Sequence, residues 1–331
     1  MSRLAISRIA LGCGNFGGVG SAPEFFGRGL TEVQAFELMD AAWESGLGWF
    51  DTADAYGGGR SEQAIGRWIA SRGVRPRLTT KTFNPMQSGA DQGLKPERTA
   101  RQLRLSLERL GVDHVELCLA HDYDPDVPLA AALGAFQAAQ EGGLIGGYGV
   151  SNFDARQLKA ALAAGAPRAV QNSYSLLVRQ DEPEVLPLCA ERGVAYLAFS
   201  PLAGGWLTGK YRRGAPYPAG SRMTQRPEPY RDFVGDPTFE ALARLEAIAT
   251  DRGTSMAGLA LAWLLADDRV AQLIIGPGHP EHLAPVAEAL EHHLTTEERT
   301  AVEAAVAGLD RGPGASGSSP KGRARSLRPP R

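Results

Sequence analysis

Short apolar segments rich in β-forming residues alternate along the chain with longer segments in which apolar residues recur three and four positions apart. The short segments predict buried strands, and the longer ones predict amphipathic helices. Because each predicted strand is followed by a predicted helix, we expect parallel strands joined by helical crossovers. The predicted strands are residues 9–12, 48–52, 78–81, 114–120, 146–150, 169–172, 195–199 and 272–275.

Capping residues support the helices between these strands. Thr31 and Gln34 form a capping-box pattern at the start of the first helix, and Gly46 follows its last turn. A second capping box, Thr295 with Glu298, predicts one further helix over residues 295–307, beyond the eighth unit. The other predicted segments are helices over residues 31–45, 61–70, 95–110, 129–140, 154–164, 181–191, 254–266 and 280–290, and a long insertion rich in proline and arginine over residues 213–236.

Eight strand–helix units within about 310 residues favour a closed α/β barrel, the (β/α)8 TIM barrel, over an open doubly wound sheet. Gly12, Gly14 and Gly17 after the first predicted strand have the spacing of the open sheet's G-x-G-x-x-G motif, but the next predicted helix begins only at residue 31, so they do not open a helix as that motif requires. A phosphate-binding loop ending in Gly-Lys-Ser or Gly-Lys-Thr is missing from the sequence. We therefore predict one barrel domain over residues 1–310, with an extra C-terminal helix.

Charge divides the chain into two unequal parts. The 331 residues hold 35 basic and 37 acidic side chains, for a net charge of -2. Residues 311–331 hold six of the basic side chains and no acidic one, so residues 1–310 hold 29 against 37, a net of -8. The basic segment has too few apolar residues to form a core and is predicted to be a disordered tail. The acidic body argues against nucleic-acid binding.

Targeting and metal-binding patterns are missing from the sequence. No apolar run approaches the ~18 residues of a membrane span, and the first residues form no signal peptide. Cys13, Cys118 and Cys189 are odd in number and widely spaced, which indicates reduced thiols and no metal site. We expect a cytoplasmic protein, and the composition rich in alanine, glycine and arginine suggests a bacterial source.

Four side chains able to ionise or share protons follow three neighbouring predicted strands: Asp51, Tyr56, Lys81 and His121. In a parallel barrel, the carboxyl ends of the strands meet at one rim and carry the chemistry. The ammonium of Lys81 is expected to lower the pKa of the Tyr56 phenol, with Asp51 orienting Lys81 and His121 polarising a substrate oxygen. Singly, each residue has a structural explanation, as a helix cap, a solvated strand end, a rim aromatic or a buried histidine. Together they suit reduction of a carbonyl by a hydride from outside the protein.

Seven motifs surround these residues along the chain. They are Phe-Asp-Thr-Ala-Asp-Ala-Tyr-Gly (50–57) with Ser-Glu (61–62), Thr-Lys-Thr (80–82), Leu-Ala-His (119–121), Gly-Val-Ser-Asn-Phe (149–153), Val-Gln-Asn (170–172), Phe-Ser-Pro-Leu-Ala (199–203) and Gly-Gly-Trp-Leu-Thr-Gly-Lys-Tyr (204–211). With these motifs in the family's order, over roughly residues 8–305, the sequence strongly resembles the aldo-keto reductase superfamily, in the bacterial branch related to potassium-channel β subunits.

The resemblance implies a barrel that binds an extended nicotinamide dinucleotide, usually NADPH, and reduces a small carbonyl compound. Tyr56 would be the general acid, Asp51 and Lys81 its tuning pair, and His121 the group that orients the carbonyl. The cofactor residues that the resemblance implies are Ser151, Asn152 and Gln171 at the nicotinamide amide, Phe199 on the nicotinamide face, and Ser200, Pro201, Leu202, Lys210 and Arg222 toward the phosphates.

The stretch after the eighth strand departs from the family pattern. Gly276 fits, but Pro285 and Val286 stand where the family has Glu-Asn. His279 and His282 are left to meet the adenosine 2′-phosphate, which is normally bound by Arg, Lys or backbone amides. NADP(H) is the expected cofactor, and NAD(H) is the alternative.

A second class of function stays open at this stage: a regulatory or redox-sensing protein that binds the cofactor with little turnover, like a channel β subunit. The physiological substrate and the oligomeric state are also open. The loops after the first, fourth and seventh strands would line the substrate pocket. Their aromatic residues suggest an apolar or sugar-stacking pocket; they are Phe16, Phe25, Phe26, Tyr123 and Trp206.

Overall fold

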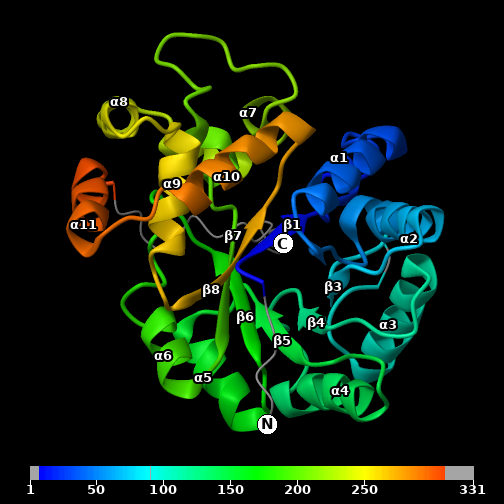
Figure 1. The fold of residues 1–331 in the computed structure, drawn as a ribbon. Coiled ribbons are helices and arrows are strands. Elements are labelled where there is room, and N and C mark those ends of the chain that lie inside the picture. Colours follow the sequence, from blue (N-terminus) through cyan, green and yellow to red (C-terminus); the bar gives the residue numbers. More distant parts are fainter. Residues whose placement is uncertain (1–6, 90, 310–331) are drawn as a thin grey trace, which may run out of the picture.

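Eight parallel strands close into a barrel in the computed structural model, which describes residues 7–89 and 91–309 (Figure 1). Each strand pairs with the next along the chain, and the last pairs with the first. The strands are β1 (Ile9–Gly12), β2 (Trp49–Asp51), β3 (Arg77–Thr82), β4 (Leu117–Ala120), β5 (Tyr148–Ser151), β6 (Ala169–Ser173), β7 (Ala195–Phe199) and β8 (Val270–Ile275). All eight predicted strands are confirmed, and so is the closed barrel.

Two shells of apolar side chains hold the barrel together. Strand residues alternate between the barrel interior and the layer beneath the helices, because successive side chains of a strand point to opposite faces. A small cluster of buried apolar residues comprises Ala10, Trp49, Leu117, Leu119, Ala169, Leu197 and Ile274. A much larger cluster includes the other strand residues and the inner faces of the helices.

Helices surround the strands as the alternating pattern predicts (Figure 1). Both predicted capping boxes are formed, at Thr31 and at Thr295, where the N-cap side chain and the N3 side chain each accept a backbone N–H. The α-helices are α1 (Glu32–Glu44), α2 (Arg60–Arg72), α3 (Pro96–Leu110), α4 (Leu129–Glu141), α5 (Ala155–Ala164), α6 (Val185–Arg192), α7 (Arg222–Gln225), α8 (Asp236–Asp251), α9 (Met256–Leu265), α10 (Ala284–Glu291) and α11 (Thr296–Ala305). The 3₁₀ helices are η1 (Pro23–Phe25), η2 (Tyr56–Gly59), η3 (Ala203–Thr208), η4 (Glu228–Phe233) and η5 (Pro280–Leu283).

The connection from β7 to β8 contains a long helix that the sequence pattern missed. Helix α8 follows the insertion directly and packs against α9 and the additional C-terminal helix α11. Its residues Thr238, Ala241, Leu242, Leu245 and Ala249 are buried at helical spacing. The usual start signal is lacking, because Gly235 precedes the helix and no side chain caps it.

The loops at the barrel mouth bury two of the aromatic residues that were expected to line a substrate pocket. Trp206 is fully buried and lies edge-on to Tyr211, with ring centroids 5.1 Å apart, beneath the insertion. Phe16 is also fully buried. The expectation that these two residues line the substrate pocket is wrong, because they pack beneath the loops. The other three aromatic residues, Phe25, Phe26 and Tyr123, are half-buried.

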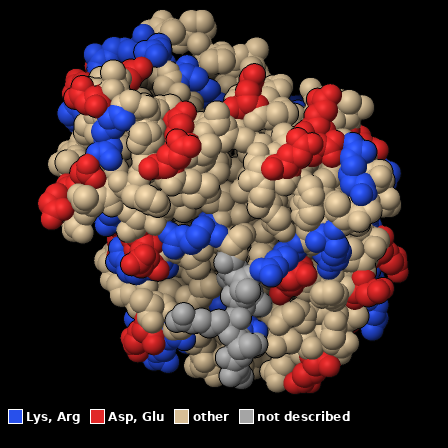
Figure 2. All heavy atoms as spheres, viewed as in Figure 1, with Lys and Arg blue, Asp and Glu red and all other residues tan. Residues whose placement is uncertain are grey.

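Several global features agree with the sequence. None of the helices in the described part of the chain is long and apolar enough to cross a membrane. All three cysteines are buried and unpaired in the structure. On the face shown in Figure 2, acidic and basic side chains are interspersed. The predicted tail, residues 311–331, lies outside the described residues.

Candidate active site

The pairing register brings Asp51 and Lys81 to the same side of the barrel wall. Asp51 ends β2 and pairs with Thr79 on β3, and Lys81 lies two residues beyond Thr79. Residues two apart on a strand share a face, so both side chains point into the barrel. Lys81 Nζ donates to Asp51 Oδ1 at 2.5 Å and to the carbonyl oxygen of Thr52 at 2.9 Å.

This ion pair is isolated from solvent, with 0% of the Lys81 side chain and 3% of the Asp51 side chain exposed. Burial by itself would lower the pKa of Lys81, but the charge of Asp51 and the hydrogen bonds at the ammonium outweigh it and raise the pKa. The second carboxylate oxygen of Asp51 accepts a hydrogen bond from Gln171 Nε2 on β6, at 2.7 Å. Lys81 is therefore held as a charged ammonium in a fixed position.

Tyr56 begins η2, five residues after Asp51, and reaches the same point. Its hydroxyl oxygen lies 3.4 Å from Lys81 Nζ. Lys81 does favour the phenolate, but burial is the larger effect and raises the pKa of Tyr56 above its ordinary value. Lys81 therefore acts in the expected direction, but the net shift of the Tyr56 pKa is upward, because the buried phenolate loses more hydration than the ammonium replaces. Tyr56 is a neutral phenol next to a positive charge, and so can donate a proton.

His121 follows β4 and completes the group. Its ring lies 5.5 Å from the Tyr56 ring, at an interplanar angle of 78°. Burial, together with the charge of Lys81, holds the pKa of His121 well below its ordinary range, so the imidazole is neutral. Its Nδ1 is buried and has no hydrogen-bond partner among the described residues. A neutral imidazole keeps one N–H, which can donate to a carbonyl oxygen.

A buried polar network supports the strand ends from behind. Asp54 Oδ2 accepts from the Thr82 hydroxyl at 2.6 Å, and Arg98 donates to the same hydroxyl at 3.0 Å. Glu62 accepts from Thr80 and from Arg109 in the same layer. Asp54 and Glu62 lie inside the quoted motifs, but no role was predicted for either, because only the tertiary contacts show what they support.

Polar residues continue along the rim from β5 to β6. Ser151 Oγ donates to the Gln171 carbonyl oxygen at 2.8 Å, and Asn152 Nδ2 donates to the His121 carbonyl oxygen at 2.9 Å. Asn152 has a backbone φ of 60°, a left-handed conformation that asparagine tolerates better than most residues. These contacts join the three residues to Asp51 and His121. The side-chain oxygens of Asn152 and Gln171 accept none of the hydrogen bonds described here, and they suit an amide ligand.

Phe199 ends β7 next to this set and is half-buried, so part of its ring is accessible. The segment after it turns sharply, with Ser200 at a φ of 56° and the amide of Ala203 donating back to the Ser200 carbonyl oxygen at 2.8 Å. Pro201 is buried and Leu202 half-buried in this turn.

Basic side chains follow β7 and β8 in the chain. Burial and the charge of Arg222 lower the pKa of Lys210, and burial, His279 and Lys210 lower that of His282. The charge of Lys210 therefore interacts with Arg222 and with His282. His282 Nδ1 accepts from the amide of Gly278 at 3.2 Å, and Gly276 faces open space. Loops after strands seven and eight are a common phosphate site in this fold.

The order along the rim therefore fits a long ligand. Amide-binding groups lie at β5 and β6, an aromatic face lies at β7, and cations lie between the β7 and β8 loops. The donor set fits a dinucleotide with an amide at one end and phosphates at the other. No group of three or more possible metal ligands is found in residues 7–89 and 91–309.

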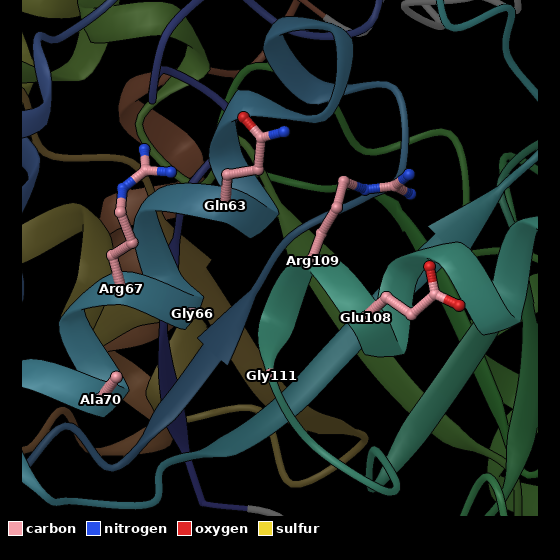
Figure 3. Close-up of a pocket in the computed structure, with 7 residues that line it drawn as sticks. All are labelled: Gln63, Gly66, Arg67, Ala70, Glu108, Arg109 and Gly111. Atoms are coloured by element: carbon pink, nitrogen blue, oxygen red, sulfur yellow. The ribbon is translucent and has the colours of Figure 1, made fainter.

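A groove on the outer wall of the barrel is separate from this site (Figure 3). It lies between α2 and α3 and shares no lining residue with the site. It is lined by Gln63, Gly66, Arg67, Ala70, Glu108, Arg109 and Gly111.

Known proteins are similar to this chain in sequence and in fold. The family model described as "Aldo/keto reductase family" matches residues 8–307. The chain is 34% identical over 312 residues to the uncharacterized oxidoreductase YrpG of Bacillus subtilis, covering 89% of this chain and 90% of the relative. It is 31% identical over 297 residues to a probable voltage-gated potassium channel subunit beta of Oryza sativa, covering 85% and 90%.

Two further similarities concern named reductases and dehydrogenases. The aldo-keto reductase yakc [NADP(+)] of Schizosaccharomyces pombe is 30% identical over 249 residues, covering 73% of each chain. The solved structure of a glycerol dehydrogenase from Gluconobacter oxydans superposes with a TM-score of 0.78, at 26% identity, covering 91% of this chain and 92% of that one.

Proposed function

The chain belongs to the aldo/keto reductase family of oxidoreductases, and from this premise we propose that it reduces an aldehyde or ketone to the alcohol with NADP(H). The observation that carries the proposal is the buried group of Tyr56, Lys81, Asp51 and His121 at the carboxyl rim. It joins a neutral phenol, a fixed ammonium and a neutral imidazole at one point. Such a group protonates an oxygen on which negative charge develops.

The role of each side chain follows from its surroundings. The Tyr56 hydroxyl donates its proton to the carbonyl oxygen, and Lys81 stabilises the phenolate that remains. Asp51 keeps Lys81 charged and in place. The His121 imidazole donates a hydrogen bond to the same carbonyl oxygen and orients it. Bound NADPH supplies the hydride that this carbonyl carbon accepts.

We assign the cofactor to the carboxyl rim, along the residues from β5 to β8. Ser151, Asn152 and Gln171 would bind the nicotinamide amide, and Phe199 would stack on its ring. The phosphates would meet Ser200, Pro201 and Leu202 in the turn, the cations Lys210 and Arg222, the neutral imidazole of His282, and the exposed backbone at Gly276. The relative named aldo-keto reductase yakc [NADP(+)] supports NADP(H) over NAD(H). The pyrophosphate that Lys210 and Arg222 would meet is common to both cofactors.

The test replaces the proton donor and leaves the proposed cofactor residues unchanged. Tyr56→Phe removes one hydroxyl and is expected to lower turnover of a carbonyl panel by about 100-fold or more, the usual contribution of a general acid. NADPH binding, followed by fluorescence titration, should be unchanged. Tyr217→Phe, a half-buried tyrosine of the insertion, is the matched control and should keep full turnover.

Two outcomes would contradict the proposal. Near-normal turnover by Tyr56→Phe would show that another group donates the proton. Oxidation of bound NADPH in a single turnover, without multiple turnovers on any carbonyl compound, would favour the sensing function that the resemblance to channel β subunits allows. A Kd lower for NADH than for NADPH would overturn the cofactor assignment.

A further inference from the structure

Three arginines at the barrel mouth differ from many arginines elsewhere on the protein. On the outer surface, guanidinium groups often face carboxylates, as in the pairs Arg72–Asp40 and Arg269–Asp267. Arg28, Arg60 and Arg226 form no ion pair with any residue of 7–89 and 91–309. Their positive charges are therefore not neutralised by the part of the protein that the structure describes.

These three arginines lie around the turn that carries Tyr56. Arg60 Nη1 donates to the carbonyl oxygen of Gly57, the residue after Tyr56, at 2.7 Å. The amide of Gly57 donates to the carbonyl oxygen of Gly20 at 3.2 Å. A side-chain carbon added at Gly20 would lie 2.9 Å from Arg226 Nη1. The β1 loop, the start of α2 and the end of α7 therefore bring guanidinium groups to the same turn.

Phe25 provides the surface on which two of them are placed. The Arg226 Cζ lies 5.4 Å from the centroid of the Phe25 ring, and the Arg28 Cζ lies 5.6 Å from it. Contact with an aromatic face positions a guanidinium without neutralising it, and leaves its N–H groups able to bind an oxyanion. The nearby carboxylate Glu24 is exposed and pairs with neither arginine in the described region.

The cofactor does not account for these charges. The phosphates already have Lys210, Arg222 and His282, which interact with one another where the β7 and β8 loops meet. Arg226 lies one turn beyond Arg222, but its side chain is directed to the β1 loop, at Gly20 and Phe25. Those residues adjoin the Tyr56 turn, where the substrate carbonyl must come.

We propose that the carbonyl substrate carries an anionic group, a carboxylate or a phosphate, which Arg226 and Arg28 bind beside Phe25 while its carbonyl reaches Tyr56. This inference rests on the proposed reductase function. Planar guanidinium groups bind both oxyanions with paired N–H donors. The positive mouth also opposes the net negative charge of the chain and so favours the approach of an anion.

The experiment compares aldehydes that are matched in shape and differ in charge. Succinic semialdehyde is paired with butanal, and 4-carboxybenzaldehyde with 4-methylbenzaldehyde, each with NADPH. We expect kcat/KM to be about tenfold or more higher for the anionic member of at least one pair, as a charge-assisted hydrogen bond implies. Arg226→Gln should remove that preference through KM, with kcat and the Kd of NADPH unchanged. Raising the salt concentration should raise KM for the anionic aldehyde only.

Arg231→Gln is the matched control, since Arg231 is an exposed arginine of the same insertion that faces Glu228. It should leave the preference intact. Equal kcat/KM within both pairs would overturn this inference and leave the reductase function standing. If Arg226→Gln raised the Kd for NADPH and kept the preference for anionic aldehydes, Arg226 would be assigned to the cofactor. That result would also overturn this inference. Failure to reduce any of the four aldehydes would overturn the reductase function and this inference with it.

Discussion

Asp54 makes a measurable contribution to the pH dependence of stability. Its carboxyl group is fully buried, and Oδ1 has no hydrogen-bond partner among the described residues. Burial raises the pKa of Asp54 from 3.8 to about 7, although the Thr82 hydroxyl opposes this shift. Arg98 contacts Thr82 and not the carboxylate itself. The folded protein therefore holds a proton on Asp54 in a pH range where the unfolded chain has released it.

The sign and the size of the effect follow from linkage. Below pH 3.8 Asp54 is protonated in both states, and above pH 7 it is ionised in both. Between these limits the folded state binds more protons, so stability falls as the pH rises. The full loss corresponds to about 4 kcal/mol at 1.36 kcal/mol per pKa unit. The side chain of the Asp54→Asn variant cannot ionise. The free energy of unfolding of the wild type minus that of the variant should therefore fall by about this amount as the pH rises from 3.8 to about 7.

Urea unfolding of both proteins at pH 5, 6, 7 and 8 measures the part of this difference that falls above pH 5, about 2.6 kcal/mol. Other carboxylates titrate equally in the two proteins and cancel. Asp232→Asn, at an exposed position in the insertion, controls for the substitution itself. Thr82→Val removes the opposing hydrogen bond and should move the titration to higher pH. A difference between wild type and Asp54→Asn that stays the same within about 1 kcal/mol from pH 5 to pH 8 would refute the reasoning.

Two further predictions concern the ion pair and the Tyr56 turn. Asp51→Asn and Lys81→Met should each lower the free energy of unfolding by about 3–5 kcal/mol, because each leaves a buried charge unpaired. The double variant should lose clearly less free energy of unfolding than the sum of the two single losses. Additive losses, measured by urea unfolding, would contradict this. Gly57 has a φ of 60°, and a Cβ added there would lie 2.7 Å from the Phe16 carbonyl oxygen. Gly46 also has a positive φ, but a Cβ added there meets nothing within 4 Å. Gly57→Ala should therefore have a Tm well below that of Gly46→Ala. Equal Tm values for the two alanine variants would show that the β1 loop can move aside.

Local sequence patterns determined the barrel. Strand-forming segments are short and buried, helical segments are amphipathic, and their strict alternation leaves few topologies other than parallel strands with helical crossovers. The positions of Asp51, Tyr56, Lys81 and His121 also followed from the sequence. Side chains at the carboxyl ends of consecutive parallel strands meet at one rim, whatever the details of packing.

Helix α8 was missed for a local reason. The pattern of its buried residues was present, but Gly235 supplied no side-chain cap, and the proline-rich insertion ran directly into it. Trp206 and Phe16 were assigned to a pocket because loop aromatics usually face solvent or ligand. Whether an aromatic residue lies above or below a loop depends on how that loop folds back, which is a tertiary property.

The tertiary structure alone decided the electrostatics of the site. The pKa of Tyr56 depends on the balance between burial and the charge of Lys81, and burial is a sum over residues from many segments. The hydrogen bond from Gln171 to Asp51 crosses from β6 to β2, 120 positions apart in the sequence. Arg28 and Arg226 meet at Phe25 only because the β1 and β7 loops pack together. Sequence patterns specify which groups occupy the rim, but distance and desolvation, which set their charges and partners, arise only when the chain is folded.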